Sequence, residues 1–323
     1  MRRRDFVAGL GAMMISPPLA HTQQALPLVG FLSLGNGFPT SPAFRRGLAD
    51  AGFFEGRNVR FEFRASPSNG QLPAFAVELV HNRPSVIVAT NSPITVVATR
   101  AASAAVPIVF TTIVDPVAYG FVASLDRPGG NVTGISLLST ELIGKRLSLL
   151  LELAPQAKKI AYLSGAASAP IYEDLRARTV GAGRALGREI IVLEIPNGRN
   201  LEAAFATLAE QGAGALILGA FTSFFPMRDR IIALAQHHKV PAMYPSANYP
   251  HAGGLMSYAA DPSETDALLG YQYVGRVLKG MKPSDLPVQQ PTRFKLALNL
   301  NAAKTIGIEV PIALQAVADE VIE

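Results

Sequence analysis

Residues 86–110 read VIVATNSPITVVATRAASAAVPIVF. The stretch begins with a short apolar run, Val86–Ala89, whose length and composition are typical of a buried strand. A helix is expected over 93–105, because Ser92 is a suitable N-cap and a proline follows it. A second apolar run, Pro107–Phe110, closes the stretch. Two strands separated by a helix predict a parallel pair with a right-handed crossover, which indicates an α/β fold.

The same alternation continues before this stretch and is then repeated after it. Upstream, the sequence predicts an apolar strand, a half-covered strand and an amphipathic helix, at 28–32, 59–63 and 72–80. Downstream, apolar runs lie about 130 residues beyond counterparts in the first set (159 minus 28, for example), at 159–163, 190–193, 215–218 and 240–243. The repetition predicts two similar Rossmann-like lobes, each built on a parallel sheet.

The end of the chain does not fit a third lobe. It predicts a strand at 254–258, a helix at 268–278, a proline-containing linker at 282–287 and a strand at 293–298. We interpret these elements as crossovers, with the helix packed on the first lobe and the last strand on the second. The expected division, with a multi-strand hinge, is 26–136 plus 258–285 for lobe one and 137–257 plus 286–323 for lobe two.

The first residues, MRRRDFVAGLGAMMISPPLAHTQ (1–23), have the features of an export signal. Arginines precede the apolar run Phe6–Ile15, which is too short to cross a membrane, since a spanning helix needs about 20 residues. Arg3 and Arg4 before a bulky apolar residue resemble the twin-arginine pattern. We expect export by that route to the periplasm. The alternatives are the general secretory route and a disordered basic start on a cytosolic protein.

The composition excludes several classes of protein. Lys and Arg number 29 against 24 Asp and Glu, a formal charge of +5 without a basic cluster, so no nucleic-acid partner is expected. The chain has no cysteine and therefore no disulfide, thiolate metal ligand, catalytic thiol or lipid-modified cysteine. Hydrophobic residues make up 49% of the chain, which allows a large core. We expect a monomer that is free in the periplasm.

The sequence contains no motif of enzyme chemistry. Gly35-x-Gly37 lacks the third glycine of a dinucleotide loop, because Thr40 stands at that position. There is no phosphate loop, no Gly-x-Ser-x-Gly elbow and no His-Glu-x-x-His. His81 and the pair at 237–238 lie at predicted helix ends, where the helix dipole stabilises a cation. We expect no catalytic residue, no cofactor and no metal site.

Polar residues follow several predicted strands, and open parallel sheets bind ligands beyond the carboxyl ends of their strands. The helix start at Ser92 favours a carboxylate or another anion, with simple helix capping as the alternative. Asp115 either meets a ligand amine or caps the next turn, and Phe221 either stacks on an apolar part of a ligand or belongs to the core. The candidate ligand residues are Ser33, Asn36, Thr90, Asn91, Ser92, Thr112 and Asp115 in lobe one and Ser164, Phe221 and Ser246 in lobe two.

Several stretches of the chain resemble one known family. They are AGFFEGRNV (51–59), DPV (115–117), RPGGNVTG (127–134), GGLMSY (253–258) and LPVQQPTRF (286–294). Nearly the whole chain is similar to the exported solute-binding proteins of ABC importers, whose characterised members include tryptophan- and tyrosine-type binders. The resemblance implies the type I periplasmic-binding fold and ABC permease subunits of the inner membrane as partners. Carried over by position, it adds Tyr258 to the expected ligand residues.

The chain departs from this family near the expected ligand. Relatives often have glycines where Asn91 and Ser92 stand, a glycine at Ala259 and a Tyr-Arg pair within 266–269. The resemblance therefore does not carry over the identity of an amino-acid ligand.

The expected function is that of a solute receptor. Its two lobes close on a small molecule, an amino acid or another small carboxylate-bearing solute, and deliver it unchanged to a membrane permease. An exported ligand sensor of the same fold is the alternative, and a hydrolytic enzyme with unrecognised residues is less favoured. A transcription regulator of similar shape is disfavoured, because no DNA-binding helix pair precedes Leu28.

Overall fold

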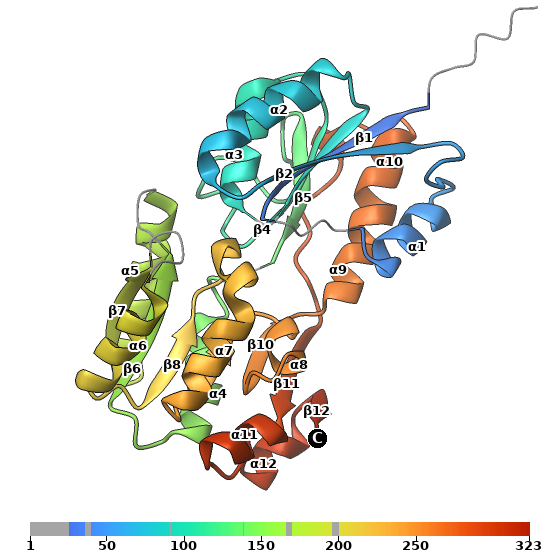
Figure 1. Ribbon diagram of the computed structural model, residues 1–323. Helices are drawn as coiled ribbons and strands as arrows, with labels where there is room; N and C mark the ends of the chain where they lie inside the picture. The colour runs from blue at the N-terminus through green and yellow to red at the C-terminus, as the bar shows by residue number, and fades with distance from the viewer. Residues whose placement is uncertain (1–25, 36–39, 91, 138, 166–169, 196–199) are drawn as a thin grey trace, which may run out of the picture.

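The computed structural model describes residues 26–323 apart from 36–39, 91, 138, 166–169 and 196–199. Two separate sheets lie one above the other in Figure 1. The upper sheet has the order β2-β1-β3-β4-β5 and is parallel throughout. Its strands are β1 (Leu28–Leu34), β2 (Arg60–Ser66), β3 (Val86–Thr90), β4 (Ile108–Thr112) and β5 (Val132–Ser136).

The lower sheet has the order β12-β11-β10-β9-β8-β6-β7. It is parallel except where β10 pairs antiparallel with β11. Its strands are β6 (Lys159–Gly165), β7 (Glu189–Ile195), β8 (Ala215–Leu218), β9 (Ala242–Tyr244), β10 (Met256–Ala260), β11 (Phe294–Asn299) and β12 (Glu320–Ile322). Two sheets with this strand order confirm the predicted pair of Rossmann-like α/β lobes.

Helices pack around each sheet (Figure 1). Those of lobe one are α1 (Pro42–Asp50), α2 (Leu72–His81), α3 (Pro93–Ala102) and a long helix formed by α9 (Pro262–Leu268), a π-helical segment (Leu269–Gly275) and α10 (Arg276–Leu278). Those of lobe two are α4 (Ile143–Leu153), α5 (Pro170–Ala185), α6 (Leu201–Glu210), α7 (Arg228–His237), α8 (Asn248–His251), α11 (Leu300–Ile306) and α12 (Ile312–Ala316). The predicted N-cap of α3 is present, since Ser92 Oγ accepts from the Ile94 amide at 3.2 Å.

The chain crosses between the lobes after β5, after β10 and before β11. The second crossing lies later than the expected boundary at residue 258, because β10 continues to pair with β11 through Ala260. The third also differs from expectation, since residues 286–289 lie against lobe one. Gln289 bridges to Ile135, and the Val288 amide donates to the carbonyl of Leu125 at 2.7 Å. Both differences arise from strand pairing, which apolar periodicity alone does not reveal.

Asp261 fastens the second and third crossings to each other. Its backbone amide donates to the carbonyl of Arg293 at 3.0 Å, and its carboxylate pairs with Lys295 Nζ at 2.9 Å. The same carboxylate caps α9 by accepting from the Ser263 amide at 3.0 Å. This cap explains why the last long helix begins at Pro262, before the predicted start at 268.

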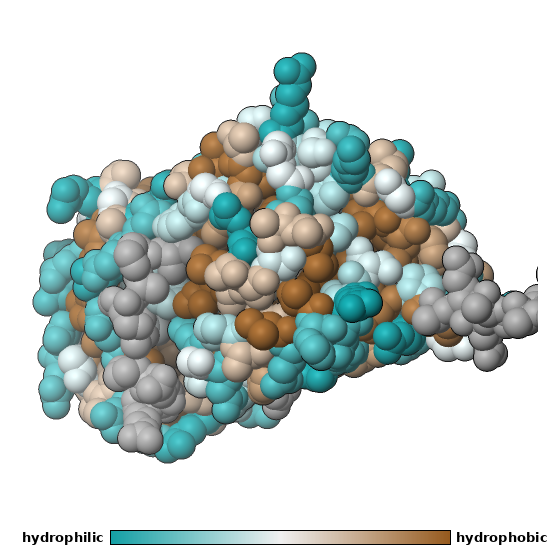
Figure 2. Space-filling view, turned by 90° about the horizontal axis from the view of Figure 1, so that it is seen from above, coloured by the Kyte–Doolittle hydropathy of each residue, from teal (hydrophilic) through white to brown (hydrophobic). Residues whose placement is uncertain are grey.

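The largest cluster of buried hydrophobic residues includes members of both lobes. It contains Phe110 and Val114 of lobe one together with Leu147, Leu163 and Leu175 of lobe two. Two smaller clusters lie within lobe one. Because the largest cluster spans both lobes, the lobes share buried apolar contacts in addition to the crossing segments. On the surface shown in Figure 2, apolar side chains form patches separated by polar ones.

We predict that Gly47→Ala destabilises the protein, because a Cβ at this position of α1 would lie 2.2 Å from the carbonyl oxygen of Ala267 in α9. Overpacking of this kind costs about 1–3 kcal/mol. Gly144→Ala is the matched control, since a Cβ there meets nothing within 4 Å and gains about 0.5 kcal/mol of helix propensity. Urea unfolding measures both free energies, and a Gly47→Ala variant as stable as the parent would contradict this packing.

Candidate functional site

The carboxyl edges of the two sheets face each other. The chain leaves β5 at Ser136 and enters lobe two at Ile143, and it leaves β10 at Ala260 and enters lobe one at Pro262. All carboxyl ends of a parallel sheet lie at one edge, so each edge points toward the other lobe. This juxtaposition brings together the loops in which the sequence predicts ligand contacts.

Hydroxyl side chains line the carboxyl edge of lobe one, as predicted. Ser33, Thr90, Ser92 and Thr112 all lie there and are buried. Thr90 Oγ1 has no hydrogen-bond partner among the residues that the structure describes. Thr112 Oγ1 accepts a long hydrogen bond from the Val114 amide at 3.4 Å. The candidates Asn36 and Asn91 lie outside the described residues.

The carboxylate of Asp115 caps the turn that follows β4. Its Oδ1 accepts from the amides of Val117 at 2.8 Å and Ala118 at 3.3 Å. Of the two alternatives for this residue, capping is the interaction present in the structure. Asp115 is exposed, so the cap does not remove the carboxylate from solvent.

Phe221 lies against the backbone at the carboxyl edge of lobe two. A Cβ on Gly165 or Gly219 would lie 2.8 or 2.4 Å from its ring, so both glycines leave room for the aromatic side chain. The ring contacts Tyr172 at a centroid distance of 5.0 Å and is only 7% exposed. Phe221 is therefore part of the core at this edge, which is the second of the two expected alternatives.

The other candidates of lobe two lie at the same edge. Ser164 is buried at the end of β6, and Ser246 is partly exposed in the loop after β9. Tyr258 of β10 is partly exposed and stacks on Phe294 at a centroid distance of 6.0 Å. The structure thus brings the described candidates to two facing edges, although they do not form one contiguous cluster of side chains.

Arg146 is a buried cation that the sequence analysis missed. Its guanidinium is 3% exposed and has no carboxylate partner among the described residues. Instead, Nε, Nη1 and Nη2 donate to the carbonyl oxygens of Tyr258, Ser139 and Pro245 at 2.7, 3.3 and 3.5 Å. Burial lowers the pKa of Arg146 to about 10. These contacts tie the first crossing to the end of β10.

A signal for Arg146 was present in the sequence. The residue stands at a helical spacing of three from Ile143 and four from Leu150, both buried in α4. A charged residue on the apolar stripe of an amphipathic helix indicates a buried charge with a structural or functional task.

Asp266 is a second titratable group that the sequence analysis did not single out. It accepts a hydrogen bond from Ser41 Oγ at 2.6 Å, and Ser41 is the N-cap of α1 beyond the carboxyl end of β1. Burial raises the pKa of the Asp266 carboxyl, and the hydrogen bond from Ser41 opposes part of this rise. No cation of the described residues pairs with it.

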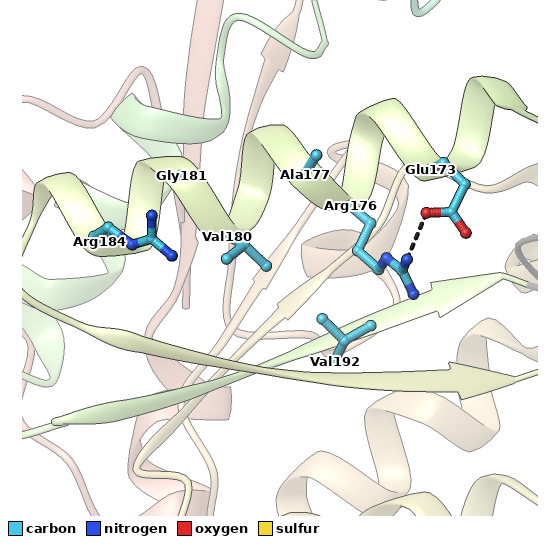
Figure 3. A pocket seen from close by; sticks show the side chains of 7 residues that line it. All are labelled: Glu173, Arg176, Ala177, Val180, Gly181, Arg184 and Val192. Atoms are coloured by element: carbon cyan, nitrogen blue, oxygen red, sulfur yellow. Dashed lines mark hydrogen bonds and ion pairs between the residues drawn. The ribbon is translucent and has the colours of Figure 1, made fainter.

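A shallow groove lies elsewhere, on the outer face of α5 beside the edge strand β7 (Figure 3). Its lining residues are Glu173, Arg176, Ala177, Val180, Gly181 and Arg184 of α5 and Val192 of β7. None of the predicted ligand residues is among them. Within the described part of the chain, no group of three or more His, Asp or Glu side chains is arranged to hold a metal ion.

Two α/β lobes, each built on a mostly parallel sheet and with their carboxyl edges facing, are the architecture of two-lobed binding proteins. The sequence profile of the ABC transporter substrate binding protein family matches residues 39–322, and the chain belongs to this family. This agrees with the resemblance drawn from the motifs. Members of the family bind substrates, so the chain is a binding protein rather than an enzyme.

Individual proteins share sequence or fold with this chain. A tyrosine-binding protein of Clostridioides difficile (strain R20291) is 24% identical over 280 residues, which cover 82% of this chain and 76% of the relative. The crystal structure of a conserved domain protein from Vibrio cholerae O1 biovar El Tor has a TM-score of 0.81 and 25% identity, covering 91% of this chain and 99% of that one. An ABC domain from Streptococcus pneumoniae in complex with L-Trp has a TM-score of 0.79 and 21% identity, covering 92% and 100%.

We predict that Asp266→Asn is more stable than the parent at about pH 7 and that this advantage disappears at low pH. A raised folded-state pKa means that the folded protein holds the proton more tightly than the unfolded chain, so stability falls as the pH rises through the folded pKa. The neutral amide of the variant avoids that loss. Below the ordinary pKa of 3.8, the side chain at position 266 is uncharged in both proteins, so their stabilities should converge.

The effect is measured as the thermal unfolding midpoint of both proteins at pH values from below 3.8 up to about 7. Asp126→Asn is the control for the loss of one negative charge, because Asp126 is exposed. An Asp266→Asn variant that is less stable than the parent at about pH 7 would mean that the carboxylate makes a favourable interaction with a cation.

Proposed function

We propose that this protein is the solute receptor of an ABC importer and binds a small molecule between its two lobes. The observation that supports this most is the facing pair of carboxyl edges, lined by buried hydroxyl groups. Thr90 Oγ1 is the clearest of these groups, because it is buried without a partner among the described residues. A buried polar atom without a hydrogen bond is unfavourable, and a ligand that enters between the lobes would satisfy it.

The ligand proposed is an amino acid or another small carboxylate-bearing solute. The relatives described above include a tyrosine-binding protein and an L-Trp complex. In this chain the ten-residue helix α3 begins at Ser92 with its N-terminus at the carboxyl edge. Amide groups and the dipole at that end favour a carboxylate. Thr90, Thr112 and Tyr258 would add hydrogen bonds around it.

Closure of the lobes would couple binding to delivery. A ligand that bridges both edges makes more contacts in the closed form and shifts the population toward it. A membrane permease would then recognise the closed shape and accept the ligand unchanged. The crossings that Arg146 and Asp261 hold would act as the hinge.

Export to the periplasm is part of the proposal. Residues 1–23, the expected signal, lie outside the described residues. Among the residues that the structure does describe, no helix has both the length and the apolar character to cross a membrane. The basic start and short apolar run support a cleaved signal, and Arg3-Arg4 support the twin-arginine route.

We predict that one narrow class of carboxylate-bearing solutes raises the thermal midpoint of the mature protein. Binding to the folded state at a ligand concentration of 100 times Kd adds about 2.7 kcal/mol of stability. The screen would contain L-tyrosine, L-tryptophan, branched amino acids, short peptides and small carboxylates, followed by calorimetry on the compounds that shift the midpoint.

A variant pair tests the site in the same screen. Thr90→Val should weaken binding about fivefold or more without loss of stability, because Oγ1 makes no hydrogen bond to the described residues. Thr305→Val, on the exposed face of α11, should bind like the parent. Absence of saturable binding by any compound would refute the receptor function, whereas equal affinity in both variants would remove Thr90 from the site.

A further prediction concerns the export route. Replacing Arg3 and Arg4 by lysine keeps the charge but removes the twin-arginine pair, so the precursor should accumulate inside the cell. Immunoblots of periplasmic and cytoplasmic fractions measure this, with Arg2→Lys as the matched control. Normal export of the double variant would favour the general secretory route.

A further inference from the structure

The beginning of α5 contacts lobe one although it belongs to lobe two. The helix follows β6, and its first turns reach the loops that follow β2, β3 and β4. In Figure 1 it lies on the side of the molecule away from α9, which follows a crossing segment. Contacts here join the two lobes at a point separate from the covalent crossings, so an opening of the lobes about those crossings would break them.

The first of these contacts joins Tyr119 of lobe one to Asp174 of α5. The Tyr119 hydroxyl donates to Asp174 Oδ2 at 3.1 Å, and Arg178 Nε donates to the same oxygen at 2.7 Å. Burial and this hydrogen bond raise the pKa of Tyr119 to about 12, so its hydroxyl keeps its proton at physiological pH. Arg178 fixes the carboxylate one helical turn away, which presents the acceptor to Tyr119.

The second contact places Tyr172 beside Ser92 and Asn69. Burial raises the pKa of the Tyr172 hydroxyl and these two lobe-one side chains lower it, while its ring is buried on Phe221. Ser92 is also the N-cap of α3, in the loop proposed to meet the ligand. Tyr172 therefore lies between Phe221 of lobe two and the lobe-one loop that we propose to meet the ligand.

We propose that the first turns of α5 are a latch that holds the two lobes together through the hydrogen bond from Tyr119 to Asp174, with Tyr172 packed beside it. The latch gives the ligand-free protein a substantial closed population, and it sets the affinity of any ligand through the fraction of protein that is competent to hold it. The inference rests on the proposed function only in that the lobes open and close. It does not depend on which ligand is bound.

The test measures the distance between the lobes in the ligand-free mature protein. Because the natural chain has no cysteine, Val97→Cys on α3 and Ala177→Cys on α5 provide a unique pair of sites for spin labels. Double electron–electron resonance then gives the distribution of distances between the two spin labels. Tyr119→Phe removes the hydroxyl that donates to Asp174 and keeps the ring, so it should lower the ratio of short to long distances about fivefold or more.

Tyr271→Phe is the matched control, because Tyr271 is 44% exposed and lies on the long helix of lobe one. Its distance distribution should equal that of the parent. An unchanged distribution in the Tyr119→Phe variant, or a parent that shows only long distances, would overturn the latch. These readings use no ligand, so failure of the latch and failure of the solute screen are separate results.

Discussion

The direction of the parallel strand is the constraint on which this structure depends. A parallel sheet collects all its carboxyl ends at one edge, and the chain leaves each sheet for the other lobe from that edge. The third crossing returns to the edge where β10 ends, so β11 must start there and run antiparallel to β10, as observed. The interface between the lobes, the proposed hinge and the loops with the predicted ligand residues therefore all arise at the same place for one geometrical reason.

Polar groups at these edges are buried at a cost in stability that packing elsewhere must offset. Arg146 is the clearest case, because three carbonyl oxygens accept from its guanidinium and no carboxylate of the described residues pairs with it. A buried charge without a counterion is destabilising in general. Carbonyl partners fix its position while leaving the local charge positive, which suits a hinge beside a site proposed to take a carboxylate.

Closure combines apolar and polar contacts with different properties. The shared hydrophobic cluster favours contact between the lobes without specifying their orientation, since burial of apolar surface is non-directional. The hydrogen bond from Tyr119 to Asp174 has a defined donor and acceptor, so it selects one arrangement. It is worth about 1 kcal/mol, a size that a bound ligand can readily match or exceed.

The sequence by itself determined the α/β alternation, the doubling into two lobes and the cap at Ser92, because apolar runs and helix caps are local patterns. It also indicated the strand ends as the place for a ligand. Only the tertiary structure decided that Asp115 caps a turn, that Phe221 lies on two glycines and that Tyr119 meets Asp174, a partner 55 positions away. Strand β5 belongs with these, since Thr133 and Gly134 interrupt its apolar run and pairing with β4 defines it. The contact of Tyr119 with Asp174 depends on the relative placement of the lobes, which the loops and crossings set and which no local pattern encodes. For Asp115 and Phe221, the sequence offered two alternatives, and the folded surroundings decided between them.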